Sequence, residues 1–232
     1  MLNIFKKQRD EFIDIKFSYF NMQVYFVRKS IFNSIKKNIS IFKGKLVDVG
    51  CGKMPYKEYI LKNSGVNSYV GLDINNAIAY DKNIKPDIIW DGENIPIESN
   101  SIDTVIATEF FEHCPHPEII FKEIYRILKD NGILYTTTPF IFPLHESPND
   151  HYRYTPYSLE NLAKKAGFKN TKIYPLGGIN ASIAQILSFW IKNKYLRVLI
   201  VPLIYILYKT DKRPRVFANN TFYTGLYGIY EK

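Results

Sequence analysis

An apolar run that ends in an acid and two alternate glycines constrains the fold of this chain more than any other feature. Residues 46–52 read Leu-Val-Asp-Val-Gly-Cys-Gly. Such a run is typical of a buried parallel strand, and the glycines permit a turn with backbone angles closed to other residues. Asp48 then lies near the carboxyl end of the strand, where open α/β sheets bind ligands. The stretch predicts an α/β sheet with a ligand crevice at this turn.

Three ligand-binding loops and an ordinary structural turn compete for this stretch. A dinucleotide loop needs a third glycine where the chain has Pro55, and a phosphate loop needs Ser or Thr where it has Met54. The remaining pattern, Asp-x-Gly-x-Gly, resembles the loop of class I S-adenosylmethionine-dependent methyltransferases. That resemblance implies that the loop binds S-adenosylmethionine, although the family often has a third glycine at the Met54 position. The residues it assigns to the cofactor here are Asp48, Gly50, Cys51 and Gly52.

The next predicted strand, residues 69–73, also ends in an acid. Asp73 follows Asp48 by 25 residues, which is one β-α-β unit. A carboxylate at this strand end can accept hydrogen bonds from both hydroxyls of a ribose, and a helix cap is the structural alternative. The resemblance implies that Asp73 and Ile74 contact the cofactor.

A third predicted strand, residues 87–91, ends in Asp91 and Gly92. In the methyltransferases that the chain resembles, the corresponding acid and next amide meet the adenine. Residues 95–103 then resemble the family segment that leads into strand four, predicted at residues 104–107. The strand-four end, Thr-Glu-Phe-Phe-Glu-His, resembles the signature at the methionine end of the cofactor. We therefore assign Glu109 to the cofactor.

His113 follows in the same signature, and we assign it to the substrate, with a structural role as the alternative. Phe110 or Phe111 is expected to pack on the cofactor, and Glu112 with His113 to orient the loop. An amphipathic helix over residues 117–128 and a fifth strand over residues 133–138 come next.

The loop after strand five, residues 139–155, is unusually rich in His, acids, Arg and Tyr. It resembles the Pro-Leu-His-Glu-x-Pro-x-Asp-x-x-Arg-Tyr-Thr loop of small methyltransferases linked to bacterial surface-polysaccharide biosynthesis. We interpret His145 as a general base for an acceptor hydroxyl and Asp150 as the group that orients it or binds substrate. Arg153 can hold an anionic group by a bidentate contact. The substrate-binding set is His113, Glu146, Tyr152 and Arg153.

Two alternatives stand beside this interpretation. The loop can be a hydrogen-bonded cover over the sheet, with His145 and Arg153 bonded to each other's neighbours. It can also bind a metal through His145, Glu146, Asp150 and His151, but no helical His-x-x-x-His spacing supports that, and we expect no metal.

Charge is distributed unevenly along the chain, whose net charge is +9. Lys and Arg outnumber Asp and Glu by 10 to 3 in residues 1–45 and by 8 to 2 in residues 176–232, whereas acids lead by 17 to 13 in between. A mildly acidic central part argues against a nucleic-acid partner. Basic flanks fit an anionic membrane surface, and a solvated basic face is the alternative. Two cysteines without a metal or disulfide spacing, and no recognisable signal peptide, favour a cytoplasmic location.

Two apolar segments flank the predicted core. Residues 1–41 are expected to be helical, as a leader packed on the domain, a lid or a membrane-surface helix. Residues 180–209 predict a helical hairpin before the last strand, at residues 222–230. The hairpin can be a monotopic membrane contact, a homodimer interface or part of the core, because its uncharged run is too short to span a bilayer.

The combined prediction is a Rossmann-like, seven-stranded, mostly parallel sheet with an antiparallel last strand. We divide the chain into a helical leader at 1–45, a methyltransferase domain at 46–178 and 221–232, and a helical insertion at 179–220. The expected reaction is methyl transfer from S-adenosylmethionine to a sugar or lipid-linked glycan. A methyltransferase of a lipophilic small molecule, such as a quinone or lipid, is the first alternative. A non-catalytic partner in a membrane-associated assembly is the second.

Overall fold

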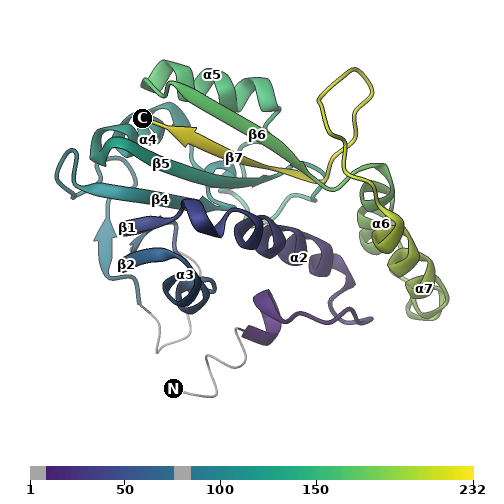
Figure 1. Ribbon diagram of the computed structural model, residues 1–232. Helices are drawn as coiled ribbons and strands as arrows, with labels where there is room; N and C mark the ends of the chain where they lie inside the picture. The colour runs from purple at the N-terminus through teal and green to yellow at the C-terminus, as the bar shows by residue number, and fades with distance from the viewer. Residues whose placement is uncertain (1–8, 76–84) are drawn as a thin grey trace.

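Seven strands form one mixed sheet in this computed structural model, which describes residues 9–75 and 85–232 (Figure 1). The order across the sheet is β3-β2-β1-β4-β5-β7-β6. Strand β7 runs antiparallel to both of its neighbours, and the other pairs are parallel. This confirms the predicted fold class. The strands are β1 (Lys43–Val49), β2 (Gly65–Ile74), β3 (Ile88–Trp90), β4 (Ile102–Thr108), β5 (Leu128–Pro139), β6 (Asn170–Leu176) and β7 (Gly225–Glu231).

Helices cover both faces of the sheet in three layers (Figure 1). The long helices are α2 (Met22–Lys37), α3 (Lys57–Asn63), α4 (Pro117–Ile127), α5 (Pro156–Ala166), α6 (Ile179–Trp190) and α7 (Lys194–Thr210). Short helical turns are a π turn, η1 (Arg9–Ile13), and two 3-10 turns, η2 (Ile39–Ile41) and η3 (Phe111–His113). Helices α4 and α5 lie on one face, and α2 and α3 lie on the other.

Alternation along the strands divides the core between the two faces. Val47 and Val105 pack in the same cluster as Phe121 of α4. Their neighbours Leu46 and Ile106 pack with Ile35 of α2 on the other face. Both faces of the central strands are therefore buried, which explains their continuous apolar sequence.

Helices α6 and α7 form the predicted hairpin and pack against α2. Tyr208 stacks on Phe26 with ring centroids 4.9 Å apart, and its hydroxyl donates to the Met22 carbonyl at 3.2 Å. The Gln185 side chain donates to the Gln23 carbonyl at 2.8 Å. Leader and hairpin, far apart in sequence, therefore share one apolar cluster. No helix in residues 9–75 or 85–232 combines the length and the apolar character that a bilayer crossing requires.

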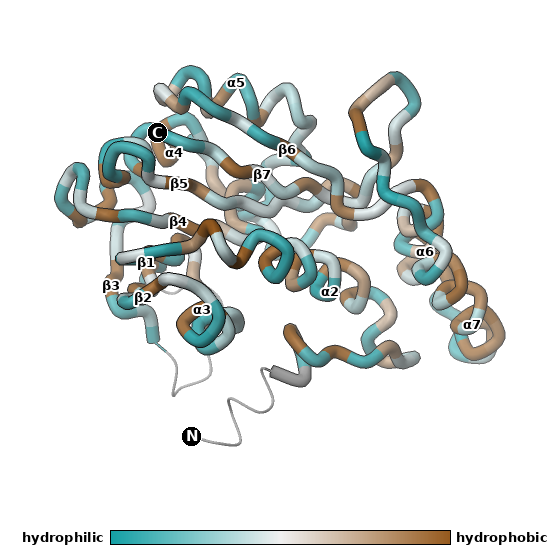
Figure 2. The backbone as a smooth tube through the Cα atoms, in the orientation of Figure 1, coloured by the Kyte–Doolittle hydropathy of each residue, from teal (hydrophilic) through white to brown (hydrophobic). Residues whose placement is uncertain are grey.

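The hairpin begins at the ligand-binding end of the sheet. Strand β6 is parallel to β5 because both run antiparallel to β7. The carboxyl end of β6 therefore points the same way as those of the other parallel strands, and α6 follows it after two glycines. Figure 1 shows α6 and α7 beyond that end of the sheet, and Figure 2 shows that much of α7 is hydrophobic.

The leader differs from the predicted continuous helix over residues 1–41. Within the described residues, helix α2 begins only at Met22. Asn21 stops it from starting earlier, because its side chain accepts a hydrogen bond from the Ser18 amide at 2.9 Å and holds a turn. Residues 1–8 of that prediction lie outside the described residues.

Helix α5 begins at Pro156, directly after the loop that follows β5. Thr155 is the cap, and Ser158 completes a reciprocal capping box with it.

Candidate cofactor and acceptor site

The loop after β1 is tied to the end of the neighbouring strand. The amides of Gly50 and Cys51 both donate to the Leu72 carbonyl, at 2.9 and 3.1 Å. Gly50 has a φ of +66°, and a Cβ at this position would overlap the ring of Phe110. Only glycine therefore fits here without strain. Cys51 is buried, and burial raises the pKa of its thiol.

Met54 replaces the family's third glycine without breaking the loop. It has a φ of +49°, the left-handed conformation that glycine adopts at little cost. Its amide donates to the Cys51 carbonyl at 2.8 Å, and its sulfur lies against Gly71, which has no side chain to displace it. Gly71 of β2 thus leaves room for the methionine that stands in place of the third glycine.

Asp48 lies under this loop with its side chain buried. One carboxylate oxygen accepts a hydrogen bond from the Tyr69 hydroxyl at 2.5 Å. The other, Oδ1, is buried without a hydrogen-bond partner. Burial raises the pKa of Asp48 to about 7, although the bond from Tyr69 opposes the shift.

Asp73 clamps the glycine loop to the end of β2. Its Oδ2 accepts from the Gly52 amide at 3.0 Å, and its Oδ1 accepts from the Ile74 amide at 2.8 Å. Each carboxylate oxygen has a second lone pair, so both can also accept from a ribose hydroxyl. The residue predicted to hold the ribose therefore also fixes the loop.

Asp91 and Gly92 follow the neighbouring strand end, because Trp90 of β3 pairs with Ile74 of β2. The Asp91 carboxylate accepts from the amides of Glu93 and Asn94, at 2.8 and 2.7 Å, and these bonds lower its pKa. Gly92 has a φ of +90° and lies beside the side chain of Ile74, which is 43% exposed. An exposed apolar side chain next to an acid and a turn amide fits the edge of an adenine.

Two carboxylates follow β4: that of Glu109, which is half-buried, and that of Glu112, which is buried. Glu109 has a φ of +49°, and its amide donates to the carbonyl and the hydroxyl of Thr137, both at 3.0 Å. Glu109 Oε1 and both carboxylate oxygens of Glu112 are buried without hydrogen-bond partners. Burial raises the pKa of Glu109 to about 7, and burial with repulsion from Glu109 raises that of Glu112.

The two phenylalanines between these acids have different roles. Phe110 lies over Gly50, as expected of a residue that borders the cofactor cleft. Phe111 is fully buried and stacks on Phe121 of α4, with ring centroids 4.4 Å apart. Of the two rings predicted to pack on the cofactor, only that of Phe110 therefore remains a candidate.

The donors and acceptors at these strand ends fit S-adenosylmethionine. Carboxylates lie at the ends of four neighbouring strands, β3, β2, β1 and β4, and Asp48 and Glu109 each have one oxygen without a hydrogen-bond partner among the described residues. S-adenosylmethionine carries a sulfonium and an ammonium group, so acidic surroundings suit it better than they suit an anionic dinucleotide. These residues would hold its ribose, adenine and methionine parts in the order that the sequence predicts.

Asp150 is the centre of the loop that follows β5, here called the acceptor loop (residues 140–155). Its side chain is fully buried and takes a bidentate contact from Arg153, at 2.6 and 2.8 Å. Its Oδ2 also accepts from the backbone amide of His145 at 3.0 Å and lies 3.0 Å from His145 Nδ1, whose hydrogen-bond partner is the Pro143 carbonyl at 3.3 Å. Arg153 holds the pKa of Asp150 well below its usual range. Asp150 therefore orients His145, one of its two predicted roles.

Arg153 is used within the acceptor loop. Besides its bidentate contact to Asp150, it donates to the carbonyls of Phe142, Pro143 and Tyr152. The bidentate partner that we expected to be a substrate anion is thus Asp150. His145 and Arg153 share this neighbour, as the hydrogen-bonded-cover alternative expects.

The acceptor loop is bonded to the segment that follows β4. The amides of His151 and Tyr152 donate to the Glu112 carbonyl, at 2.8 and 3.3 Å. The Tyr152 hydroxyl donates to the Pro115 carbonyl at 3.1 Å, and His113 Nδ1 lies 2.7 Å from the Asn149 carbonyl.

Two histidines meet across this junction. The rings of His113 and His145 lie 4.9 Å apart, and Glu146 Oε2 lies 3.6 Å from His113 Nε2. Glu112 joins this group but was not among the predicted site residues. Its adjacency to His145 crosses two segments more than 30 residues apart, so local spacing could not reveal it.

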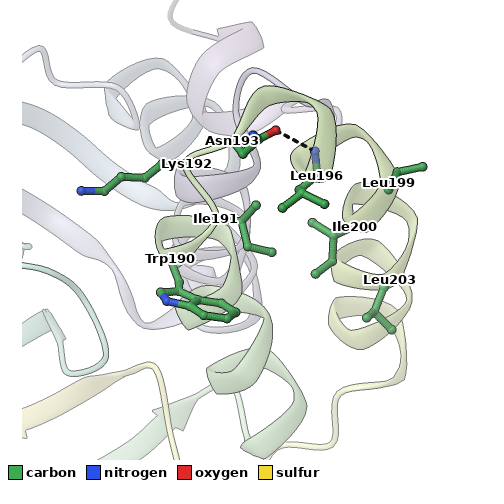
Figure 3. A pocket seen from close by; sticks show the side chains of 8 residues that line it. All are labelled: Trp190, Ile191, Lys192, Asn193, Leu196, Leu199, Ile200 and Leu203. Carbon is green, nitrogen blue, oxygen red and sulfur yellow. Dashed lines mark hydrogen bonds between the residues drawn. The ribbon is translucent and has the colours of Figure 1, made fainter.

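An apolar groove lies where α6 turns into α7 (Figure 3). The groove has a volume of about 460 Å³ and lies outside the cofactor residues. It is lined by Trp190, Ile191, Lys192, Asn193, Leu196, Leu199, Ile200 and Leu203. Next to it on α6, the ring of Phe189 lies 5.3 Å from that of Phe142, which in turn lies 5.1 Å from the ring of His145. Aromatic contacts thus link the hairpin to the acceptor loop.

Comparisons with known proteins find similarity to methyltransferases. Residues 47–136 match a family model described as a methyltransferase domain. A SAM dependent methyltransferase from Archaeoglobus fulgidus has the same fold, with a TM-score of 0.60 and 18% identity, over 93% of this chain and 100% of that one.

Two curated relatives match less than half of the chain. One is phthiotriol/phenolphthiotriol dimycocerosates methyltransferase 1 of Mycobacterium ulcerans, 28% identical over 46% of this chain and 42% of its own length. Another is a sterol 24-C-methyltransferase of Schizosaccharomyces pombe, 33% identical over 38% of this chain and 26% of its own length. The chain thus spans less than half the length of these relatives. Residues 47–136 thus match a methyltransferase domain, and the residues at the strand ends fit S-adenosylmethionine as its cofactor.

Proposed function

We propose that this protein transfers a methyl group from S-adenosylmethionine to a hydroxyl group of a lipid-linked glycan. The observation that carries the proposal is the row of ring contacts from Phe189 through Phe142 to His145. It joins an exposed apolar hairpin to a candidate base at the ligand end of the sheet. An acceptor with an apolar anchor and a polar reacting group suits such a site.

Bound S-adenosylmethionine would supply a methyl group that is already activated by its sulfonium. The work of the chain is therefore mainly to position the acceptor oxygen in line with that methyl group. Asp73, Asp91 and Glu109 would hold the cofactor, with Gly50 and Gly52 allowing it close to the backbone. Glu146 and Tyr152, both exposed at the acceptor loop, would contact the polar part of the acceptor.

His145 is the candidate base for the acceptor hydroxyl. Its Nδ1 lies 3.0 Å from the Asp150 carboxylate, which can only accept, so Nδ1 carries the hydrogen and Nε2 keeps a lone pair. The acceptor oxygen would give its proton to Nε2 as it forms the bond to the methyl carbon and the sulfur–carbon bond breaks. Asp150 acts as a positioning residue, itself held by Arg153.

The hairpin supports a membrane-surface location for this reaction. Its large apolar side chains are well exposed, including Trp190 at 74% and Leu199 at 77%. Basic residues lie between and after them in sequence: Lys192, Lys194, Arg197, Lys209, Lys212, Arg213 and Arg215. An apolar surface with basic flanks is the pattern of a monotopic contact with anionic lipid. We propose this occupant over a second copy of the chain because basic flanks would repel each other across a homodimer.

A methyltransferase of a lipophilic small molecule is the second candidate. The similarity to a sterol methyltransferase and to a dimycocerosates methyltransferase favours it. In that case the apolar groove would hold the substrate itself rather than lie against lipid. The two candidates share the cofactor site and differ in the acceptor.

A radiolabel experiment separates the candidates. The protein is incubated with methyl-labelled S-adenosylmethionine and a membrane lipid extract of its source cell, and the products are treated with mild acid. A lipid-linked glycan releases its label to the aqueous phase, whereas a methylated lipid keeps it in the organic phase. Label in neither phase, with cofactor binding intact, would favour the non-catalytic partner.

Substitution of His145 tests the base within the same assay. His145→Ala should lower the transfer rate by about 10² to 10⁴, the usual contribution of a general base, and leave S-adenosylhomocysteine binding unchanged. His151→Ala is the matched control, because His151 is an exposed histidine of the same loop. An unchanged rate in His145→Ala would exclude the assigned role.

A further inference from the structure

We propose that Glu112, His113 and His145 bind a divalent transition-metal ion, with Zn²⁺ as the first candidate. One nitrogen or oxygen from each residue lies within 4.8 Å of the others. Glu112 and His113 belong to η3, after β4, and His145 belongs to the acceptor loop, after β5. The site therefore forms only in the folded chain.

Both histidines are oriented as metal ligands. His113 Nδ1 lies 2.7 Å from the Asn149 carbonyl, and His145 Nδ1 lies 3.0 Å from the Asp150 carboxylate. Both partners only accept hydrogen bonds, so each Nδ1 carries its hydrogen and each Nε2 keeps a free lone pair. Metal-binding histidines almost always donate their other ring nitrogen to a carbonyl or carboxylate in this way.

Glu112 supplies a buried carboxylate without a partner. Its side chain is 0% exposed, and neither oxygen has a hydrogen bond. Its Oε1 lies 3.7 Å from His113 Nε2, closer to coordination geometry than to a hydrogen bond. Amides of His151 and Tyr152 bind the Glu112 carbonyl and fix the backbone. A cation between these groups would stabilise the ionised form of a buried carboxylate that accepts no hydrogen bond from the described residues.

The ligand set and its exposure favour a zinc-like ion with an open position. Two imidazoles and one carboxylate are ligands of catalytic zinc sites, whereas Ca²⁺ and Mg²⁺ prefer oxygen ligands. The histidine side chains are 19% and 25% exposed, so a fourth ligand can enter from solvent. Glu146, with Oε2 3.6 Å from His113 Nε2, is the nearest protein candidate for that position.

A bound ion would change the part that His145 plays in the proposed function. Its Nε2 can bind the ion or accept a proton, but not both. With the ion present, His145 would hold it, and the ion would lower the pKa of an acceptor hydroxyl. This consequence rests on the proposed methyl transfer, whereas the binding of the ion does not.

Titration calorimetry with Zn²⁺ tests the site on the tag-free chain after chelator treatment. We expect one ion per chain with micromolar or tighter affinity. Glu112→Gln and His113→Ala should each weaken it at least about tenfold, since loss of an outer-shell partner alone costs that much. Glu112→Gln keeps the side-chain volume and removes a buried charge, so the fold is retained. His116→Ala, an exposed histidine three residues from His113, is the matched control.

Two results would overturn the proposal. One is absence of Zn²⁺ binding by the unsubstituted chain, as expected if a protonated histidine is the intended partner of Glu112. The other is equal binding by Glu112→Gln, His113→Ala and the control. S-adenosylhomocysteine binding, measured on the same samples, reports on the proposed function separately. Absence of S-adenosylhomocysteine binding would contradict the proposed function without affecting the conclusion about Zn²⁺.

Discussion

Glu109 shows how a single residue can couple the proposed cofactor site to pH. It lies at the end of β4 in a left-handed conformation, half-buried, with one buried oxygen unpartnered. Residues held in such uncommon backbone conformations are concentrated at functional sites. Its carboxylate is poorly solvated by the protein alone, so a cationic ligand would relieve a cost that the cofactor-free chain bears.

This cost predicts a pH dependence of stability. Burial raises the pKa of Glu109 from 4.5 to about 7, so between these values the folded chain holds a proton that the unfolded chain has lost. The free energy of unfolding therefore falls as pH rises through this window. Glu109→Gln removes this contribution. Its free energy of unfolding should therefore exceed that of the unsubstituted chain by an amount that grows with pH, to on the order of 2 kcal/mol by pH 8.

Denaturant unfolding of the cofactor-free proteins at pH 5 and pH 8 measures the difference. Asp48 has a similarly raised pKa and keeps its own contribution in both proteins, whereas loss of the repulsion between Glu109 and Glu112 adds to the difference. Glu118→Gln, at an exposed acid on α4, should show no change with pH relative to the unsubstituted chain. A constant difference between Glu109→Gln and the unsubstituted chain would mean that Glu109 is ionised in the folded state throughout.

At the scale of elements, the hairpin of α6 and α7 is the addition that distinguishes this chain from a plain sheet with flanking helices. It is anchored on one side through Tyr208 and Gln185, which contact α2. Its other side carries exposed apolar residues and the groove of Figure 3. One face of the hairpin packs on α2 and the other is exposed. This explains why the apolar pattern of residues 180–209 was compatible with three roles: part of the core, a homodimer interface or a membrane contact.

A vesicle experiment tests the exposed face. The chain should sediment with phosphatidylglycerol vesicles at low salt and not with phosphatidylcholine vesicles. Burying each large apolar side chain contributes about 1.5 kcal/mol or more. The double variant Trp190→Glu/Leu199→Glu should therefore bind at least about a hundredfold more weakly.

Tyr157→Glu is the matched control, since this exposed aromatic residue lies on α5, away from the hairpin. Equal vesicle binding by the double variant and the control would rule out the proposed surface. A dimer that dissociates in the double variant would instead identify the hairpin as an interface between copies.

At the scale of the whole molecule, the sheet could be predicted because its signals are local. The apolar run that ends at Gly50, and the acids that follow the other strands, each predict a strand and the position of its carboxyl end. Packing between distant segments could not be predicted in the same way. The contact of α2 with the hairpin, and that of Glu112 with His145, depend on how the sheet brings loops together. Asn21, whose side chain holds the turn before α2, lies in a segment whose apolar spacing predicts helix.

The cofactor site was more predictable than the acceptor site for the same reason. Asp73 and Asp91 lie at strand ends, so the sheet alone determines where they are. Arg153 and Asp150 share one loop, and their sequence is equally compatible with binding a substrate and with binding each other. The structure shows the mutual contact, so His145 carries the acceptor chemistry in the proposed function.

The measurement that tests the central claim most directly is calorimetric titration of S-adenosylhomocysteine into the unsubstituted chain and Asp73→Ala. We predict micromolar binding, equivalent to roughly −8 kcal/mol, by the unsubstituted chain. Asp73→Ala should lose it, because the substitution removes both the ribose acceptor and the bond that holds Gly52. Asp130→Ala, at an exposed acid away from the cleft, should bind normally. Absence of binding by the unsubstituted chain, or full binding by Asp73→Ala, would contradict the assignment of this cleft to S-adenosylmethionine.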